Sequence, residues 1–203
     1  MPTAQRSRRS VDIAIVIFVI LALLAGGWLV IRGLGEEEEI VGEVEPPSAE
    51  ELEVMDPQDI SGRFIVERLG IDAPMGQISV ADGMTINPPN YEQVFHIRSY
   101  APLGSDDAGT AYLALHSVRG ADVPGTKLID IDSGQARLQA GETMLVDGHR
   151  YRVTDVEYSR KSATAGDEQL WQPHDGRLVV ITCLQRPAGS SLDNVLIYAE
   201  LES

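Results

Sequence analysis

The sequence predicts a mostly β fold, either an all-β barrel or a sandwich with short helical insertions. At least seven short segments rich in β-branched and apolar residues follow one another from about residue 63, separated by turn-forming residues. The helix candidates in the same region are short and weak. No internal repeat is present, and no nucleotide or metal motif has the proper spacing.

The predicted elements follow in chain order. The first strand is RFIVERLGI (63–71), closed by a turn in IDAPMG; VFHIRSYAP (94–102) and GTAYLALHS (109–117) come next, with LGSDDAG as the loop between them. The segment at 136–161 has the pattern of a meander, and its Asp147-Gly148 step predicts a tight turn. RLVVITC (177–183) and NVLIYAEL (194–201) complete the strands, and PGTKLIDI (124–131) and AGDEQLWQP (165–173) are the helix candidates.

The N-terminal part predicts a membrane anchor. Residues 13–31 carry no charge, and a helix of this length crosses the hydrocarbon core of a bilayer. Arginines precede this stretch and glutamates follow it, so the positive-inside rule places the N-terminus in the cytoplasm and the rest outside. The alternative is a cleaved signal peptide, but the stretch is long for one and no clean cleavage site follows.

These patterns divide the chain into four parts. They are a cytoplasmic N-terminus (1–12), a transmembrane anchor (13–34), an acidic linker (35–62) and a folded domain (63–203). The net charge is −15, and residues 36–62 hold eleven Asp and Glu with no Lys or Arg. Such a run predicts a solvated, self-repelling linker. No basic or aromatic-rich surface pattern points to nucleic acid.

Cys183 is the only cysteine, so no intrachain disulfide is possible. It stands where the β-branched run VVIT ends and a polar loop begins. A rigid support with access to solvent is what a reactive thiol needs. A free thiol outside the cell is exposed to oxidation, which favours a chemical role for Cys183.

A cysteine nucleophile needs a proton-transfer partner and a group that stabilises the oxyanion. Among four histidines, His116 stands out because it ends the apolar strand AYLAL and begins a loop, as Cys183 does. His96 lies within a strand and is interpreted as a packing residue. His149 follows the Asp-Gly turn and His174 lies in the loop WQPHDG, so both are expected to be exposed.

Residues 63–201 resemble the sortase family, the surface cysteine transpeptidases of Gram-positive and actinobacterial cells, with a class E- or F-like character. The resemblance lies in the order of RFIVERLGIDAPM, YAPLG…GTAYLALHS, the DG hairpin and LVVITC. It implies a sortase-like closed β-barrel that cleaves an LPxTG-type sorting signal and joins the acyl group to an amine. Cys183 would be the nucleophile and His116 the acid and base, with no cofactor and no metal.

The resemblance also implies partners. They are secreted surface proteins with a C-terminal sorting signal and an amine acceptor, either a cell-wall peptide or a pilin lysine. The domain would lie outside the cell membrane on a single N-terminal helix. Met55-Asp56-Pro57-Gln58 is similar to the lid motif of pilus-building sortases, but it lacks the aromatic residue and is interpreted as linker.

The sequence departs from the family pattern in two places. Leu115 stands where a glycine usually precedes the histidine, and Ser191 and Leu192 stand where the catalytic arginine is expected. We therefore assign the oxyanion role to Arg186, three residues after Cys183, with Arg119 as the reserve.

Two other functions stay open at this point. The missing arginine is compatible with a catalytically silent sortase-fold module that only binds sorting peptides. An L,D-transpeptidase also uses cysteine, histidine and arginine, but its histidine and glycine usually come close before the cysteine. Here the nearest preceding histidine is His174, in the loop before the strand.

Overall fold

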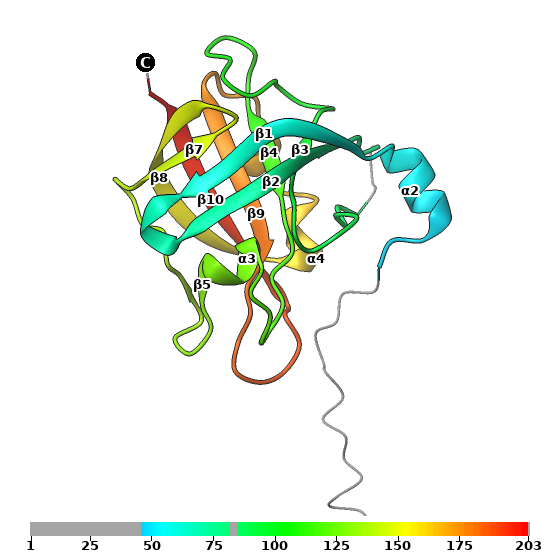
Figure 1. Cartoon of the computed structure of the whole chain (residues 1–203), viewed down its shortest axis with the longest axis vertical. Coiled ribbons are helices and arrows are strands. Elements are labelled where there is room, and N and C mark those ends of the chain that lie inside the picture. Colours follow the sequence, from blue (N-terminus) through cyan, green and yellow to red (C-terminus); the bar gives the residue numbers. More distant parts are fainter. Residues whose placement is uncertain (1–45, 82–84, 203) are drawn as a thin grey trace, which may run out of the picture. The chain divides into compact units, whose positions relative to one another are not determined.

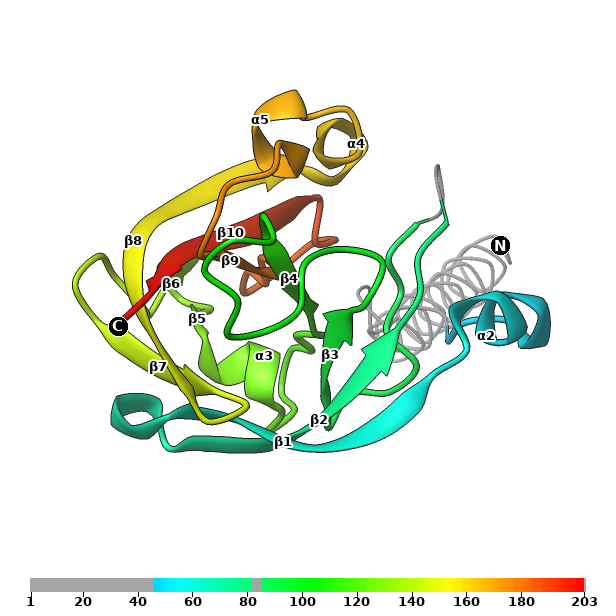
Figure 2. The same ribbon diagram turned by 90° about the horizontal axis from the view of Figure 1, so that it is seen from above.

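A closed β-barrel dominates the computed structural model, which describes residues 46–81 and 85–202 (Figure 1, Figure 2). Within these residues eight strands close the barrel in the order β1-β2-β3-β4-β9-β10-β8-β7. Neighbouring strands are antiparallel, except that β2 pairs with β3 and β4 pairs with β9 in parallel. The mostly β barrel predicted from the sequence is therefore confirmed.

The barrel strands are β1 (Gln58–Val66), β2 (Ile71–Ile78), β3 (Val94–Ile97), β4 (Ala111–Ala114), β7 (Thr143–Val146), β8 (His149–Arg160), β9 (Arg177–Cys183) and β10 (Asp193–Leu201). A small separate sheet joins β5 (Ile129–Asp130) and β6 (Gln135–Ala136). The helices are α2 (Ala49–Met55), α3 (Pro124–Lys127), α4 (Lys161–Thr164) and α5 (Glu168–Trp171), with a 3₁₀ turn at Glu67–Leu69.

The strands that lead to the candidate site agree best with the sequence. β9 ends at Cys183 as predicted, and β10 begins one residue before its predicted start. The turn between β7 and β8 is also confirmed, because Asp147 and Gly148 both have positive φ, 50° and 82°. A two-residue hairpin turn of this kind requires positive φ at both central positions.

The first predicted strand is wrong in extent. The chain reverses at the 3₁₀ turn and Gly70, whose φ is 61°, so RFIVERLGI is divided between two antiparallel strands. IDAPMG, predicted as a turn, is part of β2. The predicted helix over 124–131 stops at Lys127 and continues into β5, and the helix α4 was not predicted.

Part of the predicted acidic linker is ordered. Residues 46–62 form helix α2 and the beginning of β1. Ser48 and Glu51 cap α2 reciprocally, and Met55 at its last turn is fully buried. The Met55 carbonyl accepts a hydrogen bond from the Ser79 N–H (2.7 Å), and Asp56 pairs with Arg98 (2.6 Å). The helix is thus held against the end of β2.

The predicted membrane anchor at 13–34 and the predicted cytoplasmic segment at 1–12 lie outside the described residues. Among residues 46–81 and 85–202, no helix is long and apolar enough to cross a membrane.

Strands β4 and β9 are buried on both faces, because their successive side chains enter two different core clusters. The first cluster includes Leu113 and Val180, and the second includes Ala114 and Ile181. Helices α2 and α5 contribute Met55 and Leu170 to the second cluster. This double burial explains why β9 has an almost continuous apolar sequence, as is usual for parallel strands covered on both sides.

His96 in β3 generates a prediction about pH and stability. It is 8% exposed, and its Nε2 lies 3.0 Å from the Ala101 carbonyl oxygen. Burial lowers its pKa below the ordinary value, although the bond to Ala101 and the charge of Asp147 oppose this shift. Between the lowered pKa and about 6.5, the unfolded chain binds more protons than the folded one, so stability falls as pH drops.

We expect the free energy of unfolding to decrease from pH 7 to pH 5, and to decrease less in His96→Gln. Urea denaturation followed by circular dichroism at both pH values measures the difference. His116 contributes a loss of the same sign in both proteins, so some pH dependence remains in the variant. An equal decrease in the two proteins would contradict the assignment to His96.

Candidate active site

The candidate site lies at one end of three neighbouring strands, β4, β9 and β10, and follows from the register in which they pair. The observed register gives two rows of facing residues, Tyr112–Val179–Tyr198 and Ala114–Ile181–Leu196. Leu115 N–H donates to the Ile181 carbonyl, so the alignment of β4 on β9 extends beyond the end of β4 (3.2 Å). The next row with the same alternation is His116–Cys183–Asn194, in which Cys183 and Asn194 are paired.

This third row is polar where the first two are apolar. Side chains two residues apart along a strand lie on the same face, so His116, Cys183 and Asn194 share the face of the second core cluster. The structure therefore brings the predicted histidine and cysteine together. It also adds Asn194, which the sequence analysis missed.

A cavity of about 400 Å³ opens over this row. The loop before β3, the ends of β4 and β9, the start of β10 and the segment between β8 and β9 all contribute to it. Its lining residues are Thr85, Ile86, Asn87, Pro88, Ala114, Leu115, His116, Lys161, Thr164, Ala165, Trp171, Ile181, Thr182, Cys183 and Asn194. Lys161 is the only Lys or Arg among these described residues, and none is Asp or Glu.

His116 is held in a defined orientation. It is 5% exposed, its Nε2 lies 2.8 Å from the Pro88 carbonyl oxygen, and its ring lies 4.9 Å from the ring of Tyr91. A carbonyl oxygen only accepts hydrogen bonds, so Nε2 carries a proton. In the neutral ring Nδ1 is then the basic nitrogen.

The surroundings of His116 favour its neutral form. Burial lowers its pKa below the ordinary value, and the positive charge of Lys161 acts in the same direction. The hydrogen bond to the Pro88 carbonyl opposes both. At neutral pH the ring is therefore mainly an uncharged base, able to accept a proton from a thiol.

The loops after His116 and Cys183 are tied to each other. Ser117 Oγ donates to the Cys183 carbonyl, and Gln185 Nε2 donates back to the Ser117 carbonyl (2.7 Å). Further out, Arg119 donates to the carbonyls of Pro187 (3.0 Å) and Gly189 (2.8 Å). The predicted reserve arginine thus binds the backbone of the β9–β10 loop, and it does not line the cavity.

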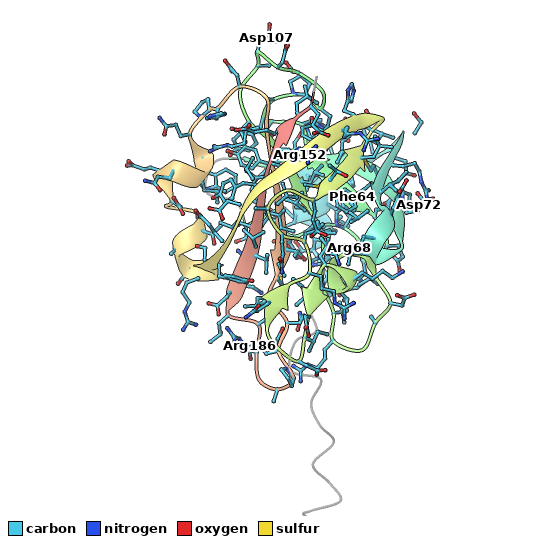
Figure 3. The ribbon with its side chains drawn as sticks, turned by 90° about the vertical axis from the view of Figure 1, so that its left-hand side faces the viewer. Phe64, Arg68, Asp72, Asp107, Arg152 and Arg186 are labelled. Carbon is cyan, nitrogen blue, oxygen red and sulfur yellow. The ribbon has the colours of Figure 1, made fainter. Side chains whose placement is uncertain are left out.

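Arg186, predicted to stabilise the oxyanion, is placed outside the cavity. Its side chain is 52% exposed and pairs with Asp193 (3.4 Å), and the guanidinium lies close to Gly134. Figure 3 labels it on the loop that follows β9. The role predicted for Arg186 would require this ion pair to open. His96, His149 and His174 do not line the cavity either.

Helix α3 supports the backbone of His116 from behind. A Cβ atom added to Gly125 would lie 2.2 Å from the His116 carbonyl oxygen and 2.7 Å from its carbonyl carbon. These are backbone atoms that cannot rotate away, so the close approach of α3 to His116 requires glycine at this position.

We expect Gly125→Ala to lower the free energy of unfolding by roughly 1–3 kcal/mol, the cost of overpacking a filled site. Thermal or urea denaturation measures the loss. Gly166→Ala is the matched control, because its added Cβ would lie 3.8 Å from its nearest neighbour, the Ala163 carbonyl. Equal stability of the two variants would show that α3 can move away without cost.

Lys161 provides a test of the electrostatics. Removing its charge in Lys161→Met should raise the pKa of His116, because a nearby like charge disfavours the imidazolium. NMR titration of His116 in the Cys183→Ala background measures this without the thiol. Lys161→Arg should leave the pKa close to that of the parent, and added salt should reduce the difference between Met and Arg. A fall in the pKa of the Met variant would contradict the arrangement.

Comparison with known proteins gives a clear result for the fold alone. No protein-family model matches the sequence, and a comparison with curated protein sequences gave no significant match. Solved structures do match. Sortase C-1 of Actinomyces oris has a TM-score of 0.54 at 15% identity, covering 80% of this chain and 84% of that one.

Two further matches agree. Sortase A of Listeria monocytogenes has a TM-score of 0.53 at 17% identity, with coverage of 71% of this chain and 88% of that chain. Sortase C-1 of Streptococcus pneumoniae has a TM-score of 0.52 at 14% identity, with coverage of 83% and 78%. The barrel that carries the His116–Cys183–Asn194 row therefore has the sortase fold.

Proposed function

We propose that the chain is a cysteine transpeptidase that cleaves an LPxTG-type sorting signal and transfers the acyl group to an amine. The observation that carries this proposal is the polar row at the ends of β4 and β9. Cys183, the only cysteine of the sequence, and His116, which is buried and has a lowered pKa, both line the same cavity there, which supports the proposal. The sortase fold supports the same reaction class.

The first half of the reaction forms a thioester. Neutral His116 accepts the thiol proton, and Cys183 Sγ attacks the carbonyl carbon that follows the threonine of the signal. The carbonyl electron pair moves to oxygen, then returns as the C–N bond breaks. The leaving amine takes the proton from His116, and the acyl group stays on Cys183.

The second half reverses the roles. An acceptor amine attacks the thioester carbonyl and gives a proton to His116. The C–S bond breaks, and the Sγ atom leaves with the electron pair and regains the proton. The acceptor would be a cell-wall peptide amine or a pilin lysine. Either one attacks as the neutral amine, so its ammonium form must first lose a proton.

The cavity suits a peptide with apolar side chains. Ile86, Trp171 and Ile181 supply an apolar lining near the thiol, while Thr164 and Asn194 supply hydrogen-bonding groups. The N-terminal helix predicted at 13–34 would keep this site outside the membrane, near secreted proteins.

One observation favours a second candidate, a sortase-fold module that binds sorting peptides without cleaving them. Arg119 and Arg186 do not line the cavity, and both donate to groups outside it. Capture of a thioester with a labelled LPxTG-type peptide separates the two functions, since a silent module binds the peptide and forms no covalent adduct.

We expect Cys183→Ala to abolish both thioester formation and peptide cleavage while the barrel stays folded. Mass spectrometry of the protein–peptide adduct and circular dichroism measure the two parts. The matched control is Cys183→Ser, which keeps a hydrogen-bonding group of similar size and should also fail to turn over. Turnover by the alanine variant would refute the nucleophile.

His116→Ala should lower the rate by at least about 10²-fold, the scale of general acid–base catalysis. The same substitution at His149 or His174, both exposed, should change the rate far less. His96→Ala should mainly lower stability, because that ring is buried away from the cavity. A ranking by peptide-cleavage rate that puts another histidine first would contradict the proposed row.

A further inference from the structure

We infer that Asn194 is a catalytic residue, and that its side-chain amide donates a hydrogen bond to the tetrahedral oxyanion formed at Cys183. This inference rests on the proposed transpeptidase function and deepens it. The sequence analysis assigned the oxyanion role to an arginine in the neighbouring loop. The structure points instead to the strand beside the nucleophile.

The position of Asn194 is fixed by the sheet. It pairs directly with Cys183 across the antiparallel strands β9 and β10. Side chains of such a pair lie on the same face with Cβ atoms about 5 Å apart. Both residues line the cavity, so a carbonyl group attacked by the thiol lies within reach of the amide.

The amide is also held in place. Asn194 Nδ2 donates to Thr164 Oγ1 (3.1 Å), and this hydroxyl donates to the Arg160 carbonyl (3.0 Å). Thr164 is buried, 7% exposed, so the bond is protected from solvent. An amide nitrogen has two N–H groups, and the second has no partner among the described residues. Because Asn194 lines the cavity, this second N–H is available to a group bound there.

The other side-chain N–H groups that line the cavity are less suitable, and Trp171 Nε1 already donates to the Thr164 carbonyl (2.8 Å). His116 already donates from Nε2 to the Pro88 carbonyl and transfers protons in the proposed reaction. Asn87 precedes Pro88 in a loop and is not on a strand next to Cys183. Lys161 has an exposed side chain at the start of α4. It adds positive charge to the cavity, which complements a neutral amide donor.

The amide of Asn194 would act when Cys183 attacks the peptide carbonyl and an oxyanion forms. As the S–C bond forms, the carbonyl electron pair moves to oxygen, and the charge increases at the acceptor of the Asn194 N–H. When the intermediate collapses, the electron pair on oxygen re-forms the C=O bond, the C–N bonding pair leaves with the nitrogen, and His116 protonates that amine. A donor placed before the reaction stabilises this charge without reorganisation, and losing one such donor typically costs about 10²–10³-fold in kcat.

The test compares two reactions of the same thiol. Thioester formation with a labelled LPxTG-type peptide passes through an oxyanion, whereas alkylation by iodoacetamide displaces iodide and does not. We expect Asn194→Ala to slow thioester formation by about 10²–10³-fold and to leave the alkylation rate within about twofold of the wild type. Asn194→Asp, which has a similar shape and no N–H, should slow thioester formation at least as much.

Each other outcome overturns a defined statement. If both rates fall together, Asn194 acts on the thiol or the fold and not on the oxyanion. If Asn194→Ala forms the thioester at the wild-type rate, the inference is wrong while the transpeptidase proposal stands. If Asn194→Ala forms the thioester at the wild-type rate and Arg186→Ala forms it much more slowly, the oxyanion role belongs to Arg186. If the wild-type protein forms no thioester with any peptide of an LPxTG-type library, the proposed function fails and the inference falls with it.

Discussion

The parallel pairing of β4 and β9 is the interaction on which the site depends. The two strands come from distant parts of the chain, and their register decides which residues meet at their ends. Both strands are buried on both faces, so a shift by one residue would turn Leu113 and Val180 out of one core cluster and into the other. Hydrophobic burial thus fixes the register, and the register places His116 beside Cys183.

The loops that follow β4 and β9 are also fixed relative to each other, by hydrogen bonds between them. Backbone carbonyls of Cys183 and Ser117 are bound by side chains from the opposite loop, and Gln185 is almost fully buried in this link. Buried polar groups that are fully hydrogen-bonded specify one arrangement, since any alternative would leave them unsatisfied. The thiol and the imidazole are consequently held on one rigid base rather than on two independent loops.

The sequence predicted the parts of the site that depend on local pattern. An apolar strand followed at once by a polar loop predicted His116 and Cys183 as site residues, because each strand end is visible in its own segment, and both residues line the cavity. Asn194 could not be found in this way. Its place beside Cys183 comes from the register of β10 on β9, which depends on how the β9–β10 loop folds back. Arg186 was assigned by its proximity to Cys183 in sequence, but its side chain pairs with Asp193 and does not line the cavity.

Helix α2 has a sequence pattern that the acidic composition of the segment made easy to miss. The acidic run suggested a disordered linker, yet SAEE carries the Ser-x-x-Glu pattern of a capping box, and the structure uses it. The first predicted strand failed for a related reason. Gly70 at positive φ allows a reversal that an apolar pattern alone does not reveal.

The connection between β8 and β9 has a consequence for how this scaffold can diversify. It carries α4 and α5 and supplies Lys161, Thr164 and Trp171 to the cavity wall. Its two flanking strands pair with β10 and not with each other, so the insertion can change length without altering the ladder. The cavity wall and the His116–Cys183–Asn194 row are therefore separable: exchanging residues 161–176 between barrels of this fold would change the wall and leave the row in place.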